Sequence, residues 1–405
     1  MEKTIVLIGT LDTKGAEYRY IRDRIVEQGC RVIVVDVGIR GKPLFQPDIT
    51  REQVAQAAGL SIEEVASRIE GEGIQMMSRG AAKIVQELHR SGKLDGILSL
   101  GGTMGTFAGT AVMRTLPLGV PKVMVSTHAS GDTSPYVGTK DIVMIPSMAD
   151  IIGLNQITKN VLTMAAGAVV GMVKVAPGPV SSDKPLIGLT IHGDLMPCAN
   201  FVTELLGQRG YEVVFFHAVG IGGKTLEEWI EQGLIDGVFD LVTTEVLQNI
   251  FGGLYDAGPT RLEAAGAKGI PQLVAPGKTD TITFDTTHGI PERFRSRELY
   301  LHTPVRVGTS TTKEERAQLG KVMAEKLNKA TGPTAVIIPQ KGFSGGDKEG
   351  SYMYDPEADL ALINALKKNL KPDIRLVEVD AHINDRLFAE KAATLLDELM
   401  HEARR

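Results

Sequence analysis

The chain has 405 residues, enough for two or three domains of ordinary size. With 43% hydrophobic residues, 23% charged residues and a net charge of -5, it has the composition of a soluble globular protein and no basic excess that would favour nucleic acid as a partner. Its two cysteines, Cys30 and Cys198, are too few for a disulfide framework and lack metal-like spacing, which favours a reducing, cytoplasmic location.

The first half of the chain alternates between predicted strands and helices. Residues 4–8 enter a strand directly, without the regions of a secretory leader. Further strands are expected at 31–36, 94–100, 122–126 and 141–145, and helices at 16–28, within 49–90, at 107–115 and within 151–173. The longest uncharged apolar run, 161–173, has the length of a buried core helix, so we expect no membrane partner.

Proline and glycine at Pro177–Pro179 and Asp183–Pro185 break this pattern, which predicts domains at 1–180 and 184–405. The second half then repeats the first in order: 185–190 matches 4–8, 211–216 matches 31–36, 236–242 matches 95–100, and 269–274 matches 119–124. We therefore expect two related α/β domains with mostly parallel sheets. The second carries an appendix, with strands at 334–338 and 375–379 and helices at 356–369 and 386–402.

Three polar loops of the first domain follow predicted strands and should meet at one edge of its sheet. We expect a phosphate-binding site there, with Lys14 as a countercharge and Asp12 or Asp132 as Mg²⁺ ligands. The expected nucleotide-binding residues are Gly9, Thr10, Asp12, Thr13, Lys14, Gly101, Gly102, Thr103, Gly105, Thr106, Ser126, Thr127, Ser130, Gly131 and Asp132. The alternative for Lys14 and Asp12 is helix capping on a solvated surface.

The centre of this site is the hexapeptide Gly101–Thr106, which lies between a predicted strand and a helix rich in small residues. Backbone N–H groups that converge at a helix N-terminus bind anions. We expect Gly101, Gly102 and Gly105 to adopt φ > 0 and to let the backbone approach a ligand. The segment lacks the Walker A pattern, and a tight strand-to-helix turn without a ligand remains the alternative.

A second candidate site follows strands of the second domain. His192, His217 and Glu245, together with Asp194, are candidates for acid–base catalysis or for metal binding. None has the helical spacing of a metal-binding histidine pair, so ordinary hydrogen-bonded histidines are the alternative. The loop Gly220–Gly223 precedes a helix and is expected to bind a small anion.

The third candidate cluster combines Arg293, Arg295 and Arg297 with His302, and adds His382 and Asp385 near the C-terminus. Arg293, Arg295 and Asp385 are expected to bind a substrate, with His382 as a catalytic residue in a cleft between the domains. The glycine-rich loop Gly342–Gly350 is a candidate lid. A solvated turn with one structural ion pair is the alternative for the arginines.

These segments together resemble a known family, that of the ATP-binding proteins named after the tomato inhibitor of tomato mosaic virus RNA replication. The resemblance is carried, in order along nearly the whole chain, by Gly9–Gly15, Gly101–Thr106, Val125–Asp132, Pro135–Gly138, Asp150–Asn155, Phe251–Gly253, Ala257–Glu263, Pro291–Arg295 and His382–Asp385. It implies two Rossmann-like domains, ATP with Mg²⁺, and a homodimer. The plant member's extra barrel-like C-terminal domain is expected to be absent, and no reaction or antiviral role is implied.

Three functions are consistent with these features. The first is an ATP-dependent enzyme that acts on a small acidic or carbonyl metabolite between the domains. The second is a regulatory or interaction protein that binds a nucleotide without chemistry, and the third is a metal-dependent hydrolase or lyase centred on His192, His217 and Glu245.

Overall fold

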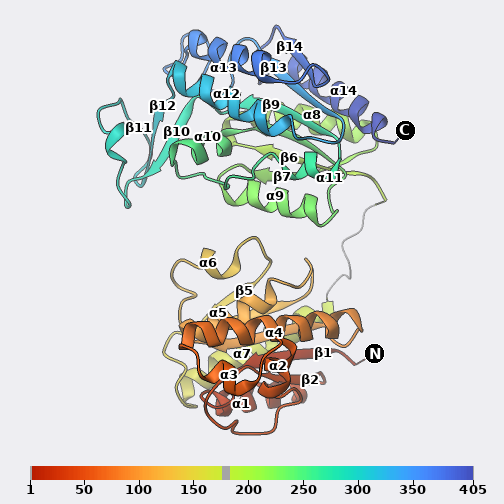
Figure 1. The fold of residues 1–405 in the computed structure, drawn as a ribbon, viewed down its shortest axis with the longest axis vertical. Helices are drawn as coiled ribbons and strands as arrows, with labels where there is room; N and C mark the ends of the chain where they lie inside the picture. The colour runs from red at the N-terminus through yellow and green to blue at the C-terminus, as the bar shows by residue number, and fades with distance from the viewer. Residues whose placement is uncertain (1, 176–182, 405) are drawn as a thin grey trace. The chain divides into compact units, whose positions relative to one another are not determined.

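The computed structural model describes residues 2–175 and 183–404. The chain forms two compact units, Met1–Ser181 and Ser182–Arg405 (Figure 1). The predicted boundary segment Pro177–Pro179 lies outside the described residues. Within the described residues, no helix is both long and apolar enough to cross a membrane.

The first unit is a parallel five-stranded sheet with strand order β2-β1-β3-β4-β5. Its strands are β1 (Thr4–Gly9), β2 (Arg31–Asp36), β3 (Gly96–Gly101), β4 (Lys122–Ser126) and β5 (Val143–Pro146). Its helices are α1 (Gly15–Glu27), α2 (Arg51–Ala57), α3 (Ile62–Ala66), α4 (Glu70–Arg90), α5 (Thr103–Met113), α6 (Ser134–Val137) and α7 (Gln156–Val175). The predicted run 161–173 therefore lies inside one long helix.

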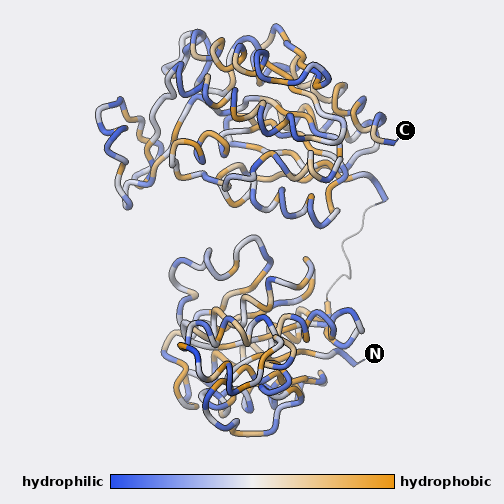
Figure 2. The backbone as a smooth tube through the Cα atoms, in the orientation of Figure 1, coloured by the Kyte–Doolittle hydropathy of each residue, from blue (hydrophilic) through white to orange (hydrophobic). Residues whose placement is uncertain are grey.

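Helices cover both faces of this sheet, because alternate residues of a strand point to opposite sides. Ile5 and Leu7 of β1 belong to a buried cluster with α1 and α7. Val6 and Ile8 belong to a second cluster with α2, α4 and α5. The helices alternate between hydrophobic and hydrophilic colour along their turns, as expected for helices with one buried face (Figure 2).

The second unit is a parallel six-stranded sheet with strand order β14-β13-β9-β8-β6-β7 and a separate antiparallel sheet, β10-β12-β11. Its strands are β6 (Leu186–Ile191), β7 (Glu212–His217), β8 (Gly237–Val242), β9 (Gln272–Gly277), β10 (Thr281–Asp285), β11 (Tyr300–Thr303), β12 (Arg306–Ser310), β13 (Thr334–Pro339) and β14 (Arg375–Val379). Its α-helices are α8 (Met196–Gln208), α9 (Ile221–Glu231), α10 (Thr244–Phe251), α11 (Ala264–Lys268), α12 (Lys313–Leu327), α13 (Pro356–Asn369) and α14 (Arg386–Glu402). The core clusters place α8 and α14 on one face of the large sheet and α9 to α13 on the other.

The topology confirms the internal repeat. Read from the opposite edge, β7-β6-β8-β9-β13 follows the same order as β2-β1-β3-β4-β5, with all strands parallel. Both units are therefore Rossmann-like α/β folds. The predicted appendix strand at 334–338 is instead the fifth strand of the repeat. Within the large sheet, β14 is the strand that has no counterpart in the first unit. The sequence analysis did not predict the antiparallel sheet; within 281–310 it considered only the arginine cluster with His302.

One buried arginine of the second unit forms ion pairs with several carboxylates. Arg261 is 1% exposed and pairs with Glu245 at 2.8 Å, with Glu227 at 2.8 Å and with Asp240. Glu245 also accepts backbone hydrogen bonds from Gly220 at 2.8 Å and Gly223 at 3.0 Å, at the start of α9. Predicted as a catalytic or metal-binding residue, Glu245 is fully buried in this network.

We expect Arg261→Met to lower the free energy of unfolding of the second unit by about 3–5 kcal/mol, because it leaves buried carboxylates without a counter-ion. The single tryptophan, Trp229 on α9, reports this unfolding in urea by fluorescence. Lys321→Met removes only an exposed pair with Glu325 and should change stability by less than about 1 kcal/mol. Equal effects of the two substitutions would contradict the assigned role of Arg261.

Candidate functional site

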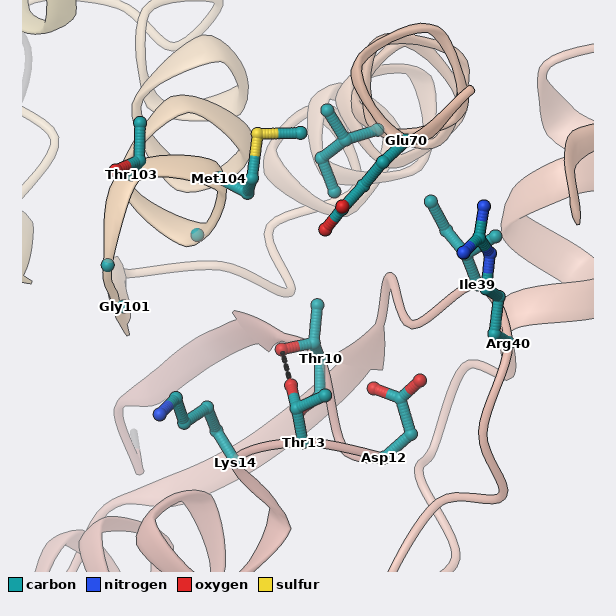
Figure 3. A pocket seen from close by; sticks show the side chains of 13 residues that line it. Thr10, Asp12, Thr13, Lys14, Ile39, Arg40, Glu70, Gly101, Thr103 and Met104 are labelled. Atoms are coloured by element: carbon teal, nitrogen blue, oxygen red, sulfur yellow. Dashed lines mark hydrogen bonds between the residues drawn. The ribbon is translucent and has the colours of Figure 1, made fainter. Parts of the chain in front are cut away.

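The first unit contains a cavity of about 300 Å³ at the carboxyl ends of β1, β2 and β3 (Figure 3). It lies where the strand order reverses around β1, which is the usual ligand position of an open parallel sheet. The loop Thr10–Lys14 lines one side and Gly101–Gly105 another. Ile39, Arg40, Glu70 and Ile74 complete the wall.

Two helix N-termini meet this cavity. The helix α5 begins at Thr103, four residues earlier than predicted, with Gly102 as its N-cap and without a side-chain cap. The helix α1 begins at Gly15, directly after Lys14, and also lacks a side-chain cap. The first-turn N–H groups of each helix have no acceptor within the helix, so both ends favour an anion.

The prediction of positive φ in the hexapeptide is wrong. Gly102 has φ -79°, and Gly101 and Gly105 are absent from the residues with positive φ. Close packing explains two of these glycines, since a Cβ on Gly101 would lie 2.7 Å from the Gly105 Cα. A Cβ on Gly102 would meet only the Thr127 Oγ1, at 3.9 Å, so this position faces open space.

The polar side chains of the cavity are partly engaged with one another. The hydroxyls of Thr10 and Thr13 lie 2.7 Å apart (Figure 3). The Lys14 Nζ donates to the Ile151 carbonyl. The Asp12 Oδ2 accepts from the Gly41 N–H at 2.9 Å, whereas its Oδ1 is buried without a partner among the described residues. That orphaned oxygen is free to ligate a cation.

A second, hydroxyl-rich cavity of about 470 Å³ adjoins the first, because Gly102 and Thr103 line both. Ser126, Thr127 and Ser130, which the sequence analysis assigned to the nucleotide site, line this cavity, and so does the segment Ser147–Asp150. The Thr103 hydroxyl lies 2.9 Å from the His128 Nε2. The N-terminus of α5 is thus exposed to two cavities that differ in their lining.

Four residues predicted for the nucleotide site line neither cavity: Gly9, Thr106, Gly131 and Asp132. Thr106 is buried and bonds the Ser126 hydroxyl at 2.7 Å. Asp132 accepts from the N–H and hydroxyl of Ser134, at 3.0 and 2.7 Å, and holds the start of α6, so its role as a Mg²⁺ ligand loses support.

The second unit brings together only part of its predicted site. His192, Asp194, His217 and His302 line one cavity of about 580 Å³. The His382 ring uses both nitrogens, accepting from the Asn384 N–H at 3.1 Å and donating to the Ser344 carbonyl at 2.9 Å, so its predicted catalytic role loses support. Asp385 accepts from the His382 N–H at 2.8 Å.

The predicted arginine clamp does not form. Arg293 donates to the Phe251 carbonyl and stacks on Phe294, and Arg295 donates to the Ile290 carbonyl at 2.9 Å. Arg297 forms a double hydrogen bond with Glu315, at 2.8 and 2.9 Å, which matches the structural ion pair considered as the alternative.

The structure also bears on the predicted anion loop and the predicted lid of the second unit. The anion at Gly220–Gly223 is the chain's own Glu245 carboxylate. The cavity-lining part of the Gly342–Gly350 loop is anchored rather than free, because the Ser344 hydroxyl donates to the buried Asp280 at 2.8 Å. Among the described residues, no three His, Cys, Asp or Glu side chains gather as a metal-binding set.

Sequence reasoning missed Ile39, Arg40 and Glu70 in the first cavity and Lys278, Tyr255 and Arg306 in the second. Ile39, Arg40 and Lys278 could have been predicted, because each follows the carboxyl end of a predicted strand, where ligands of parallel sheets bind. Nothing in the sequence pattern places Glu70 or Arg306, which reach their cavities from α4 and from the unpredicted small sheet.

Gly101→Ala should destabilise the protein by about 1–3 kcal/mol, since the added Cβ meets helix backbone. Gly102→Ala should cost less than about 1 kcal/mol, because its surroundings are open and its φ is ordinary. Urea unfolding followed by circular dichroism compares the two variants. The reverse order of stability would show that close packing is not the reason for glycine at 101.

Sequence comparisons identify relatives that cover the whole chain. The model of the N-terminal domain of the uncharacterised protein family UPF0261 matches residues 3–177, and the model of its C-terminal domain matches 184–400. A UPF0261 protein of Clostridium tetani (strain Massachusetts / E88) is 45% identical over 99% of this chain and 100% of its own length. The ToMV resistance protein Tm-1(GCR237) of Solanum lycopersicum is 34% identical over 95% of this chain, which corresponds to 54% of the plant protein.

Among solved structures, the UDP-N-acetylglucosamine 2-epimerase of Rickettsia bellii aligns over 99% of this chain and 98% of its own, at 12% identity and a TM-score of 0.24. The corresponding enzyme of Methanocaldococcus jannaschii aligns over 98% and 99%, also at 12% identity and a TM-score of 0.24. Scores this low carry no inference about ligands. The two consecutive family models and the full-length relative show that the chain belongs to the UPF0261 protein family.

Proposed function

We propose that the first unit binds ATP with Mg²⁺, with the phosphates at the N-termini of α5 and α1. The observation that supports this most strongly is the meeting of two helix ends without side-chain caps at one cavity that also contains Lys14. Helix N-termini at the carboxyl edge of a parallel sheet are the general phosphate site of such folds. The resemblance noted in the sequence implies the same ligand.

The remaining groups of the cavity suit the other parts of the nucleotide. Ile39, Ile74 and Met104 provide an apolar wall against which a base can pack. Asp12, with its buried and unpartnered Oδ1, fits a Mg²⁺ ion, which typically takes one or two carboxylates and completes its shell with phosphate and water. The hydroxyls of Thr10, Thr103 and Thr127 can donate to phosphate oxygens.

We further propose that the protein is an ATP-dependent enzyme that acts on a small acidic or carbonyl metabolite in the cytoplasm. The second unit supports this role, because it contains a cavity lined by histidines and a half-buried lysine. The buried thiols of Cys30 and Cys198 suit a reducing compartment.

A regulatory protein that binds ATP without turnover is the alternative. The metal-dependent hydrolase loses support, because Glu245 is committed to Arg261.

Gly102→Val should abolish ATP binding measured by isothermal titration calorimetry, because the side chain fills space between the two cavities where a phosphate is proposed. Gly207→Val is the control: its Cβ meets open space on α8 of the second unit, so affinity should be unchanged. Asp12→Asn should remove most of the gain in affinity that Mg²⁺ gives the wild type. An unchanged ATP titration for a folded Gly102→Val variant would place the site elsewhere.

A homodimer is part of the same proposal, and α7 offers a surface for it. Ile157 and Met164, two turns apart on one face of α7, are 57% and 62% exposed. Gly167 and Gly171 have open space around them, which allows close helix approach. Met164→Glu should convert a dimer to a monomer of 43.5 kDa by light scattering, whereas Val26→Glu on α1 should not. A monomeric wild type would refute this proposal.

A further inference from the structure

The second unit contains a cavity of about 580 Å³ that no nucleotide-binding feature explains. Its floor is formed by segments that follow β6, β7 and β9, and the small sheet β10–β12 and the loop at Gly345–Met353 form its remaining walls. All of these segments lie within one compact unit. The small sheet interrupts the repeat after β9, so this cavity has no counterpart in the first unit.

A lysine is held rigidly in this cavity. Lys278 has φ 57°, an unfavourable conformation for a side chain of this size, and its N–H donates to the Phe343 carbonyl at 2.9 Å. Its Nζ lies 3.2 Å from the Asp194 Oδ2 and 3.7 Å from the Asp280 Oδ2. Burial disfavours its charge, but Asp280 and Asp194 outweigh burial and raise the pKa of Lys278. It is therefore a fixed ammonium rather than a nucleophilic amine.

Beside Lys278, the carboxylate of Asp194 orients the ring of His192. The Asp194 Oδ1 lies 2.9 Å from the His192 Nδ1. Burial opposes ionisation of Asp194, but the hydrogen bond from His192 and the charge of Lys278 lower the pKa of Asp194 well below its usual range. An ionised carboxylate on Nδ1 fixes the tautomer that leaves Nε2 as a proton acceptor.

The rest of the cavity favours an anion. Lys278 faces the carboxylates of both Asp194 and Asp280, whereas Arg306, the other cation that lines the cavity, has no ion-pair partner within 4 Å among the described residues, so its charge is available to an anion. The His217 ring lies 5.7 Å from that of His192, and burial, followed by the nearby His192 and Arg306, lowers the pKa of His217. His217 is thus neutral at pH 7.

We propose that this cavity binds a small carboxylic acid that carries a carbonyl group, and that His192 transfers a proton at the carbon next to that carbonyl. Arg306 holds the carboxylate. His192 Nε2 takes the proton from the carbon, the C–H electron pair forms the C=C bond of an enolate, and the displaced carbonyl electrons become an oxyanion beside the Lys278 ammonium. Return of the proton reverses these changes, so the step consumes no other reactant.

This inference extends the proposed enzyme role by naming its substrate class and residues. It is tested without ATP, so its failure and a failure of nucleotide binding are read separately. The probes are pyruvate, 2-oxobutanoate and oxaloacetate in deuterated buffer, and deuterium incorporation next to the carbonyl is followed by proton NMR. The wild type should exchange at least one of them faster than buffer.

His192→Gln should lower the exchange rate by about 10²–10⁴-fold, as expected for loss of a general base. Asp194→Asn should lower kcat more than it changes KM, since Asp194 positions the histidine. Arg306→Met should raise KM at least tenfold, because Arg306 is proposed to hold the substrate carboxylate. Lys341→Met, an exposed lysine paired with Asp380, is the matched control and should have no effect.

Exchange that is no faster than buffer for all three acids would overturn the proposal. So would exchange that survives His192→Gln in a protein whose melting temperature is unchanged. Exchange that is lost equally in Lys341→Met would also count against it, because that side chain is outside the cavity.

Discussion

A helix that begins at the edge of a parallel sheet presents N–H groups without acceptors in the helix, where a negative charge is stabilising, and the two units differ in what lies there. In the second unit, Glu245 supplies the charge from within, accepting from Gly220 and Gly223 at the start of α9 while Arg261 balances it. In the first unit, α5 and α1 lack side-chain caps and border a cavity. One repeat therefore completes its own anion site, and the other leaves one available to a ligand.

The repeat explains how one architecture offers two different sites. Aligning the Asp-Gly pairs that begin β3 and β8 places Met104 opposite Glu245, so a residue that lines the first unit's cavity at the ends of β1, β2 and β3 corresponds to the anchor of the buried network. The second unit loses this space but gains the sheet β10–β12 after β9. That insertion encloses Lys278, His192 and His217 in a separate cavity. In both units a cavity lies at the carboxyl edge of the parallel sheet, and the linings of the two cavities differ.

Glycine in the hexapeptide illustrates how one residue type serves distinct physical needs. Gly101 allows the helix α5 to pack against the end of β3, where even a methyl group would meet backbone at 2.7 Å. Gly102 faces open space instead, which is what a ligand at the helix N-terminus requires. Neither position depends on a left-handed conformation. Strain is found instead at Lys278, where the surrounding hydrogen bonds and ion pairs hold an unfavourable backbone in place.

The sequence by itself determined the two α/β domains, their parallel strands and the repeat, because hydrophobic periodicity, turn residues and segment order are local signals. It also found the loops Thr10–Lys14 and Gly101–Gly105, since polar residues after buried strands must reach the carboxyl edge. Only the tertiary structure decided which polar residues are free. Glu245, His382 and Arg297 were plausible site residues, but each is engaged by a partner distant in sequence or by a nearby backbone group. Long-range pairing depends on how elements pack, and composition and spacing do not encode it.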